Sequence, residues 1–291
     1  MSQKLKVLLI TGKVTFEHNY RMINEMLRTL LESTGRFEVH ITEEFHGATD
    51  RTLKDYDSVL INYDGKHYVT DTTDIFDPSA MKALLDFVDS GKGAVFFHSS
   101  LWMDEIWPDA YRQLAGGYLS MKDGSRKNPK SDAIVYTKAP GHPITQGAAK
   151  AWMAVEDDFF AGVFWHPKAE IEVLATVPES IDDYVNVPGF ADRYQPANKD
   201  TSALTGLPAM GADIPVMWTN RYGGGRVFCS TLGHSDGTIK RVNFLTMFIR
   251  GVEWAATGAV TLDFPDRSGE RRIWPWPFYE PGDYKGCDAK I

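Results

Sequence analysis

Residues 77–98 read DPSAMKALLDFVDSGKGAVFFH and contain one predicted helix followed by one predicted strand. Asp77 and Pro78 are residue types favoured at the N-cap and at the first position of a helix, and the apolar residues that follow recur at helical spacing. A glycine-flanked turn then leads into the apolar run AVFF, which stops at His98. A short run that is apolar throughout is typical of a strand buried on both faces of a parallel sheet.

The first half of the chain repeats this alternation. Apolar runs at residues 6–12, 36–43 and 57–65 predict three further strands, and residues 20–34 carry an apolar stripe at helical spacing. Strands that alternate with helices of this length predict an α/β fold, in which a mainly parallel central sheet is covered by helices on both faces.

The second half is more mixed. Strands are predicted at residues 131–138, 151–160 and 170–177. Residues 214–234 predict a hairpin around three consecutive glycines, and residues 240–257 predict the last helix. Residues 178–213, which are rich in Pro, Gly, Asp and Asn and show no periodicity, are interpreted as a long excursion from the fold.

The chain is predicted to form a single domain over residues 1–291, because its length fits one large domain and no internal repeat divides it. The core of this domain spans residues 1–258. The tail, residues 259–291, contains IWPWPFYEPGDY, whose prolines exclude a helix or a central strand. We expect its aromatic side chains to pack on the same domain or on a second copy of the chain, which would make the protein a homo-oligomer.

Composition and charge exclude several classes of partner. Lys and Arg number 31 against 39 Asp and Glu, so the formal charge is −8. We expect no nucleic-acid partner, because phosphate backbones require a basic face. The most basic stretch, SRKNPKSD at residues 125–132, is interpreted as a solvated loop.

No membrane partner is expected, because no run approaches the roughly 18 apolar residues of a membrane span. The N-terminal residues lack the apolar stretch of a secretory signal. The sequence as written therefore predicts a cytoplasmic protein. A periplasmic location is the alternative for a chain from which a signal peptide has been removed.

Polar side chains follow the predicted strands, and in an open parallel sheet ligands bind beyond the carboxyl ends of the strands. The candidates selected by this rule include His18, Asn62, Asp64, His98, Glu156, Asp157, Asp158 and His234. His98 and His234 stand out because each follows an apolar strand directly. A turn role is the alternative for Asp64, and a capping or solvated role is the alternative for Asp157 and Asp158.

Three kinds of chemistry could use these residues. Nucleophilic catalysis of the amidase kind is not favoured, because Cys229 lies inside a strand pattern and no His-x-Glu motif occurs. Imidazoles and carboxylates suit zinc or another divalent ion, although no closely spaced ligand motif is present. Proton transfer by a histidine needs the fewest features in the sequence. The reference pKa of histidine lies near 6.5, so the side chain can act as an acid or a base near neutral pH.

Several motifs together resemble the trehalose-utilisation (ThuA-like) family, up to about residue 258. They are GKGAVFFHSS (91–100), LAGGY (114–118), GHPITQG (141–147), EDDFF (156–160), PVMWTNRYGGGRVFCSTLGH (215–234) and FIRGVEWAATG (248–258). The resemblance implies the flavodoxin-like sandwich of the class I glutamine amidotransferase-like superfamily. It also implies that His98 occupies the place of the catalytic cysteine, so that glutamine amidotransferase activity is absent.

The resemblance further implies a bacterial role in carbohydrate catabolism, often beside sugar dehydrogenases that make 3-keto sugars. The family's polar positions match His18, His98, Glu156, Asp157 and His234. The chain departs from the family in LSMKDGS (119–125), where relatives often have a histidine.

From these arguments we predict a hydrolase or lyase that acts on a small carbohydrate, namely an oxidised (3-keto) sugar or glycoside. His98 is predicted to be the base and His234 the acid or the group that polarises the carbonyl, while Glu156 orients one of them. A non-catalytic sugar-binding or regulatory protein is one alternative. A metal-dependent hydrolase with His18, His98 and His234 as ligands is another, and zinc is then the expected ion.

Further residues are predicted to bind the substrate. Trp102 or Trp218 is expected to stack on the sugar face, with a core role as the alternative for either. The other predicted substrate-binding residues are His18, Asn62, Asp64 and Asp157.

Overall fold

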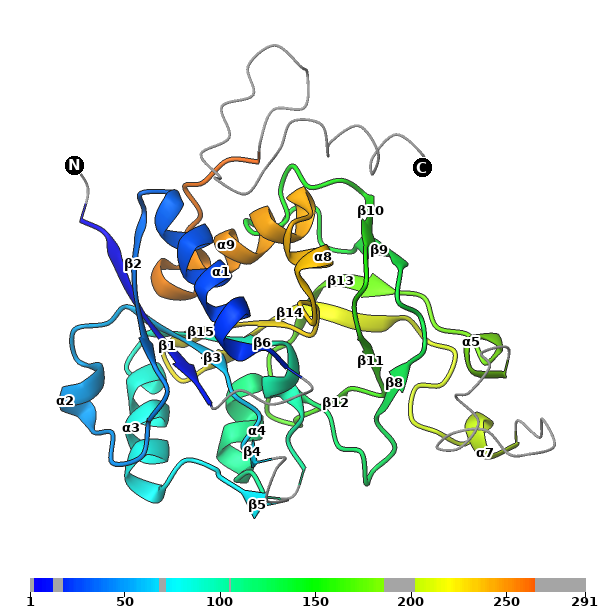
Figure 1. The fold of residues 1–291 in the computed structure, drawn as a ribbon, viewed down its shortest axis with the longest axis horizontal. Coiled ribbons are helices and arrows are strands. Elements are labelled where there is room, and N and C mark those ends of the chain that lie inside the picture. The colour runs from blue at the N-terminus through cyan, green and yellow to red at the C-terminus, as the bar shows by residue number, and fades with distance from the viewer. Residues whose placement is uncertain (1–2, 13–17, 68–71, 105, 186–201, 265–291) are drawn as a thin grey trace, which may run out of the picture.

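A computed structural model describes residues 3–12, 18–67, 72–104, 106–185 and 202–264. A nine-stranded sheet runs through the molecule, with helices above and below it (Figure 1). The strands, in spatial order, are β10 (Ala151–Ala154), β9 (Ala133–Thr137), β13 (Glu172–Val177), β14 (Ile214–Tyr222), β15 (Gly225–Ser230), β6 (Gly93–Phe97), β3 (Ser58–Asn62), β1 (Leu5–Thr11) and β2 (Phe37–Thr42).

Most strands of this sheet run in one direction. The five from β15 to β2 are mutually parallel, and β14, β13, β9 and β10 extend the sheet by antiparallel pairing. Only β14 and β9 are therefore reversed, so seven of the nine strands share a direction. The carboxyl ends of β1, β3, β6, β15 and β10 consequently lie at one edge, and the predicted α/β fold with a mainly parallel sheet is confirmed.

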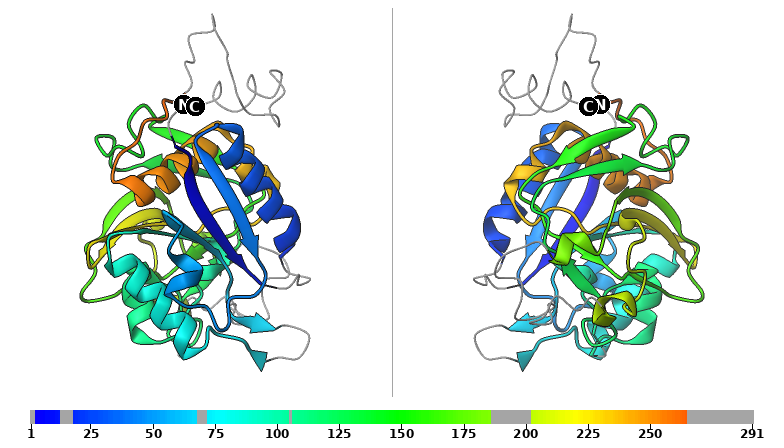
Figure 2. Two further views of the ribbon diagram at one scale, coloured as in Figure 1. Left: turned by 90° about the vertical axis from the view of Figure 1, so that its left-hand side faces the viewer. Right: turned by 90° about the vertical axis from the view of Figure 1, so that its right-hand side faces the viewer.

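Helices cover both faces of the sheet, as the side views in Figure 2 show. One layer contains α1 (Tyr20–Ser33), α8 (Asp236–Ile239) and α9 (Val242–Thr257), and the other contains α2 (Asp50–Leu53), α3 (Pro78–Asp89) and α4 (Asp109–Ala115). The predicted cap of α3 is present, since the Asp77 side chain accepts hydrogen bonds from the amides of Ser79 and Ala80. No helix of the described residues is both long and apolar enough to cross a membrane.

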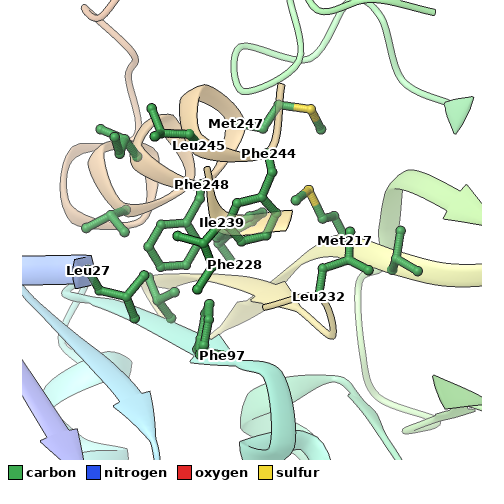
Figure 3. Packing of buried hydrophobic residues seen from close by; sticks show 14 of the residues in the cluster. Leu27, Phe97, Met217, Phe228, Leu232, Ile239, Phe244, Leu245, Met247 and Phe248 are labelled. Carbon is green, nitrogen blue, oxygen red and sulfur yellow. The ribbon is translucent and has the colours of Figure 1, made fainter. Parts of the chain in front are cut away.

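The core beneath α9 contains aromatic rings packed among leucine, isoleucine and methionine side chains (Figure 3). Phe97 at the end of β6 meets Phe248 of α9 edge to face, with ring centroids 5.4 Å apart. Phe228 of β15 lies beneath Gly251, where an added Cβ would come within 2.3 Å of the ring. The absence of a side chain at Gly251 therefore lets the helix approach the sheet closely.

Smaller elements surround the sheet. They are the two-residue strand pair β4 (Lys66–His67) and β5 (Thr72–Thr73), the pair β7 (Gly117–Tyr118) and β12 (Phe164–Trp165), the pair β8 (Arg126–Asn128) and β11 (Phe159–Ala161), the 3-10 turn η1 (His98–Leu101), and the short helices α5 (Asp182–Val185) and α7 (Ser202–Thr205). The predicted strand at 151–160 is thus two strands, β10 and β11, joined by a turn in which Glu156 has a φ of 53°.

The interpretation of residues 125–132 as a solvated loop was wrong. Arg126 lies in β8 and is fully buried, because its guanidinium donates to both carboxylate oxygens of Glu179. The carboxylate of Glu179 also accepts hydrogen bonds from the Tyr184 hydroxyl and from the amide of Gly211. These contacts attach the described parts of the 178–213 segment to the rest of the domain. Residues 186–201 lie outside the described residues.

The start of the predicted tail packs on the domain. Val260, Leu262 and Phe264 contact the main core, and the Glu253 carboxylate of α9 accepts hydrogen bonds from the amides of Thr261 and Leu262. The rest of the tail, residues 265–291, lies outside the described residues.

Candidate functional site

Three histidines from distant parts of the chain meet at the carboxyl edge of the sheet. His18 follows β1, His98 follows β6, and His234 follows β15. One ring nitrogen from each can be chosen so that all three lie within 4.8 Å of one another. The ring centroids are 5.1 to 5.4 Å apart, and each pair of rings is steeply inclined. Among the described His, Cys, Asp and Glu residues, these three form the group whose ligand atoms lie close enough together to hold a metal ion.

The orientation of the His98 ring follows from its main-chain surroundings. Its Nδ1 lies 2.7 Å from the carbonyl oxygen of Thr231, which can only accept, so Nδ1 carries the proton. In the neutral ring, Nε2 is then an unprotonated acceptor. Burial, with the neighbouring His18 and His234, lowers the pKa of His98 well below its usual value. His98 is therefore neutral near pH 7 and able to bind a metal or accept a proton.

His98 also has a strained backbone, with a φ of 49° in the left-handed region. Such a conformation in a residue other than glycine costs about 1–3 kcal/mol, and strain of this kind gathers at functional sites. Among the described residues, His98, Glu156 and Ala209 have a positive φ without being glycine. Two of these three lie at or beside the histidine cluster.

The backbone of His234 is held by the buried carboxylate of Asp157, which accepts hydrogen bonds from the amides of Gly233 and His234. Burial raises the pKa of Asp157 to about 6, against the lowering effect of these amide donors. Asp157 is 2% exposed. The prediction that Asp157 binds substrate is therefore wrong, because its oxygens are engaged in positioning the turn that carries His234.

The carboxylate beside the His234 ring belongs to Asp158. Its Oδ2 lies 3.2 Å from His234 Nδ1, and its Oδ1 lies 2.6 Å from the ammonium of Lys127 on β8. Glu156, which was predicted to orient a histidine, is exposed on the preceding turn. The structure thus corrects this assignment from Glu156 to Asp158.

Aromatic residues border the cluster on one side. The Phe160 ring lies 4.9 Å from the His98 ring, and Trp102 packs edge to face on Phe160 at 5.2 Å. On the other side, His18 stacks on Tyr20, whose hydroxyl lies 3.3 Å from the Ser99 hydroxyl. Trp102 is thus near the site, and its predicted contact with a sugar stays a prediction.

The structure places three other predicted substrate-binding residues in the interior. Trp218 is fully buried, and its Nε1 donates to the carbonyl oxygen of Ala115 at 3.2 Å, so it cannot stack on a sugar. Asn62 is 2% exposed and donates to the side chain of Asn24. Asp64 is 1% exposed, and its predicted contact with a substrate stays a prediction. All three are residues of the protein interior.

A separate hollow of about 480 Å³ lies at the opposite edge of the sheet, where β14 ends. Its lining includes Arg221, Glu172 and Trp254. His142 of the GHPITQG motif also lines it and accepts a hydrogen bond from the Ile144 amide through Nδ1. This hollow contains none of the three clustered histidines.

The histidine cluster has the chemistry of a metal site. Zinc sites bind imidazole nitrogens, and those that keep an open position are catalytic. Ligating histidines commonly donate their second ring nitrogen to a backbone carbonyl, as His98 does to Thr231. The residues present therefore fit a divalent cation.

Comparison with known proteins identifies the family. The sequence matches the ThuA family, described as trehalose utilisation, over residues 6–255. The chain belongs to this family. No curated protein matches the sequence. Membership of the ThuA family places the chain in carbohydrate utilisation and confirms the resemblance found in the motifs.

Solved structures share the fold. A ThuA-like protein from Parabacteroides merdae is 22% identical, with a TM-score of 0.68 over 91% of this chain and 94% of that one. A ThuA-like protein from Bacteroides uniformis is 18% identical, with a TM-score of 0.62 over 89% and 96%. A cytoplasmic protein from Salmonella typhimurium is 15% identical, with a TM-score of 0.53 over 86% and 99%. These matches agree with the predicted flavodoxin-like, glutamine amidotransferase-like fold.

Proposed function

We propose that this ThuA-family chain is a metal-dependent enzyme of carbohydrate catabolism, in which His18, His98 and His234 hold one divalent cation such as zinc. The observation that carries this proposal is the convergence of the three imidazoles within 4.8 Å. The hydrogen bond from His98 to Thr231 supports it, because it puts the proton on Nδ1 and leaves Nε2 of His98 with the unprotonated lone pair that a metal ligand needs. Three histidine ligands leave a position open for substrate or water.

The proposed substrate is a small oxidised sugar or glycoside with a ketone at C3. Such a ketone acidifies the hydrogen on C2, and a cation bound at the site would polarise the carbonyl. When the C2 proton is removed, its electron pair forms a C1=C2 double bond as the C1–O bond breaks. The departing oxygen takes up a proton. Addition of water across the double bond then completes a net hydrolysis.

A second candidate uses the same residues without a metal. Its support is the neutral His98, whose Nε2 lies 3.3 Å from His234 Nδ1. In this version His98 takes the C2 proton and His234 protonates the departing oxygen. A third candidate, a non-catalytic sugar-binding or regulatory protein, would bind the sugar without turnover.

One set of measurements separates the three candidates. The purified full chain is assayed by elemental analysis, and sugar release from 3-keto-trehalose or a 3-keto-glucoside is followed before and after treatment with a chelator. The metal-dependent proposal predicts about one ion per chain, with turnover lost on chelation, restored by added zinc and abolished in His98→Ala. The matched control is His40→Gln on β2, whose exposed ring contacts Tyr56 and Glu38, and it should behave as the unaltered chain.

The other outcomes are equally distinct. Turnover that survives complete metal removal would support the metal-free candidate. Saturable sugar binding without any turnover, in a folded protein loaded with zinc, would support the non-catalytic one.

A further inference from the structure

Two ring nitrogens and a carboxylate oxygen lie close together at the histidine cluster. His98 Nε2 is unprotonated in the neutral ring, because Nδ1 donates to Thr231. His234 Nδ1 lies 3.3 Å from this atom and 3.2 Å from Oδ2 of Asp158. Because His98 Nε2 and Asp158 Oδ2 both accept, His234 Nδ1 is the donor in these contacts, towards a nitrogen lone pair and a carboxylate oxygen.

The spacing of these atoms is also that of ligands around one metal ion. In a tetrahedral zinc site with bonds of about 2.0–2.1 Å, adjacent ligand atoms lie roughly 3.3 Å apart. The distances from His234 Nδ1 to His98 Nε2 and to Asp158 Oδ2, 3.3 and 3.2 Å, are close to this value. Asp158 lies outside the group of three whose ligand atoms are all within 4.8 Å of one another, so its carboxylate must turn towards the cation to bind it. A cation near His98 Nε2 would therefore replace the shared proton of His234 and come close to Asp158.

We propose that Asp158 supplies a carboxylate ligand to the cation held by the three histidines, in a site that becomes five-coordinate when an oxygen of the substrate or of water binds. The inference rests on the metal site of the proposed function and adds the acidic residue of that site. The three imidazoles are neutral ligands, and a carboxylate adds a negative charge to them. This charge raises the affinity of the site for a divalent cation. Asp158 is suited to this because its side chain is only 14% exposed and thus poorly screened by water.

Lys127 opposes this role. Its ammonium lies 2.6 Å from the other oxygen of Asp158, so it offsets the negative charge of the carboxylate. A bound cation and Lys127 compete for the same negative charge and also repel each other. The two residues should therefore act on metal affinity in opposite directions, which is not expected of two residues that merely support the fold.

The test measures zinc affinity by titration of the metal-free full chain, and records the absorption spectrum of the cobalt-substituted protein. Asp158→Asn should lower the zinc affinity about 10–100-fold and change the cobalt spectrum. Lys127→Met should raise the affinity several-fold, whereas Asp158→Glu, which keeps the carboxylate, should recover part of the loss. The matched controls are Asp86→Asn and Lys82→Met, which alter an exposed pair on α3 by the same charges.

Each possible result either supports or contradicts the roles assigned to Asp158 and Lys127. If Asp158→Asn binds zinc within twofold of the unaltered chain with an unchanged cobalt spectrum, the assignment of Asp158 is wrong while the three-histidine site stands. If both the Asp158 and the Lys127 variants weaken binding while circular dichroism shows them folded, the opposing role of Lys127 is overturned. If the unaltered chain binds no zinc or cobalt, the metal-dependent function itself fails, together with this inference.

Discussion

The Nε2 atom of His98 lies 3.3 Å from the Nδ1 atom of His234, although 136 residues separate them in the chain. The sheet accounts for this proximity. β6 and β15 are parallel neighbours with Phe97 opposite Ser230, so the chain leaves both strands at the same edge. His98 follows Phe97 at once, and the turn from Thr231 to Gly233 then brings His234 back towards it.

This geometry predicts that Gly233→Ala damages the site. Gly233 has a φ of 118°, which L side chains rarely adopt, and an added Cβ would lie 2.2 Å from the ring of Phe97. The turn must shift, and His234 shifts with it. We expect about 1–3 kcal/mol of lost stability and at least tenfold weaker zinc binding. Denaturant unfolding and zinc titration measure the two effects.

The control for this prediction is Gly141→Ala, where nothing lies within 4 Å of the added atom. This variant should leave zinc binding unchanged. Normal zinc affinity in a folded Gly233→Ala protein would show that the turn does not hold His234 in place.

A second prediction concerns the buried ion pair between Arg126 and Glu179. Removing one partner leaves the other charge buried and uncompensated, so Arg126→Met should destabilise the protein by about 3–5 kcal/mol. The side chains of Arg126 and Glu179 are at most 1% exposed. Replacing both partners by apolar residues, as in Arg126→Met with Glu179→Leu, should cost clearly less than the single change.

The exposed pair of Lys82 and Asp86 on α3 serves as the comparison, because water screens it. Lys82→Met should change stability by about 0.5 kcal/mol or less. Equal losses in the Arg126 and Lys82 variants, measured by denaturant unfolding, would contradict the distinction between buried and exposed pairs.

The sequence was sufficient to predict the main strands and the edge of the sheet where the histidines meet, because apolar runs and the polar residues after them mark the strand ends. His18, His98 and His234 were found in this way. Lys127 was missed because its place depends on the short pair of β8 and β11, in which Lys127 lies opposite Phe160. Two strands of three residues have too little apolar periodicity to be recognised.

The direction in which side chains point was a second reason why some site residues were predicted wrongly. Trp218 lies in a strand that is buried along most of its length, so alternation gave no sign of which face meets water. Glu156, Asp157 and Asp158 are consecutive acids, and only the backbone of the turn decides which one faces His234. Glu156 has a φ of 53° there, and the next two carboxylates turn inward.

A third prediction separates the two tryptophans first proposed to stack on a sugar. Trp218→Phe removes the donor to the buried carbonyl oxygen of Ala115, so we expect a loss of about 1–3 kcal/mol in stability. Its binding of 3-keto-glucoside should be unchanged. Trp102→Phe keeps an aromatic ring beside Phe160, whereas Trp102→Ala removes it and should weaken sugar binding. Weaker sugar binding in Trp218→Phe, by calorimetry on folded protein, would reverse this assignment.

A fourth prediction concerns thermal stability. A ligand that binds the folded chain at about 100 times its dissociation constant stabilises it by roughly 2.7 kcal/mol. Zinc should therefore raise the unfolding midpoint of the full chain by roughly 5–10 °C.

His234→Ala should lose most of this rise, because one of the three clustered imidazoles is gone. His40→Gln should keep it, since the exposed His40 contacts Tyr56 and Glu38 on β2 rather than the cluster. An equal rise in the His234 and His40 variants would mean that zinc stabilises the protein from a site elsewhere.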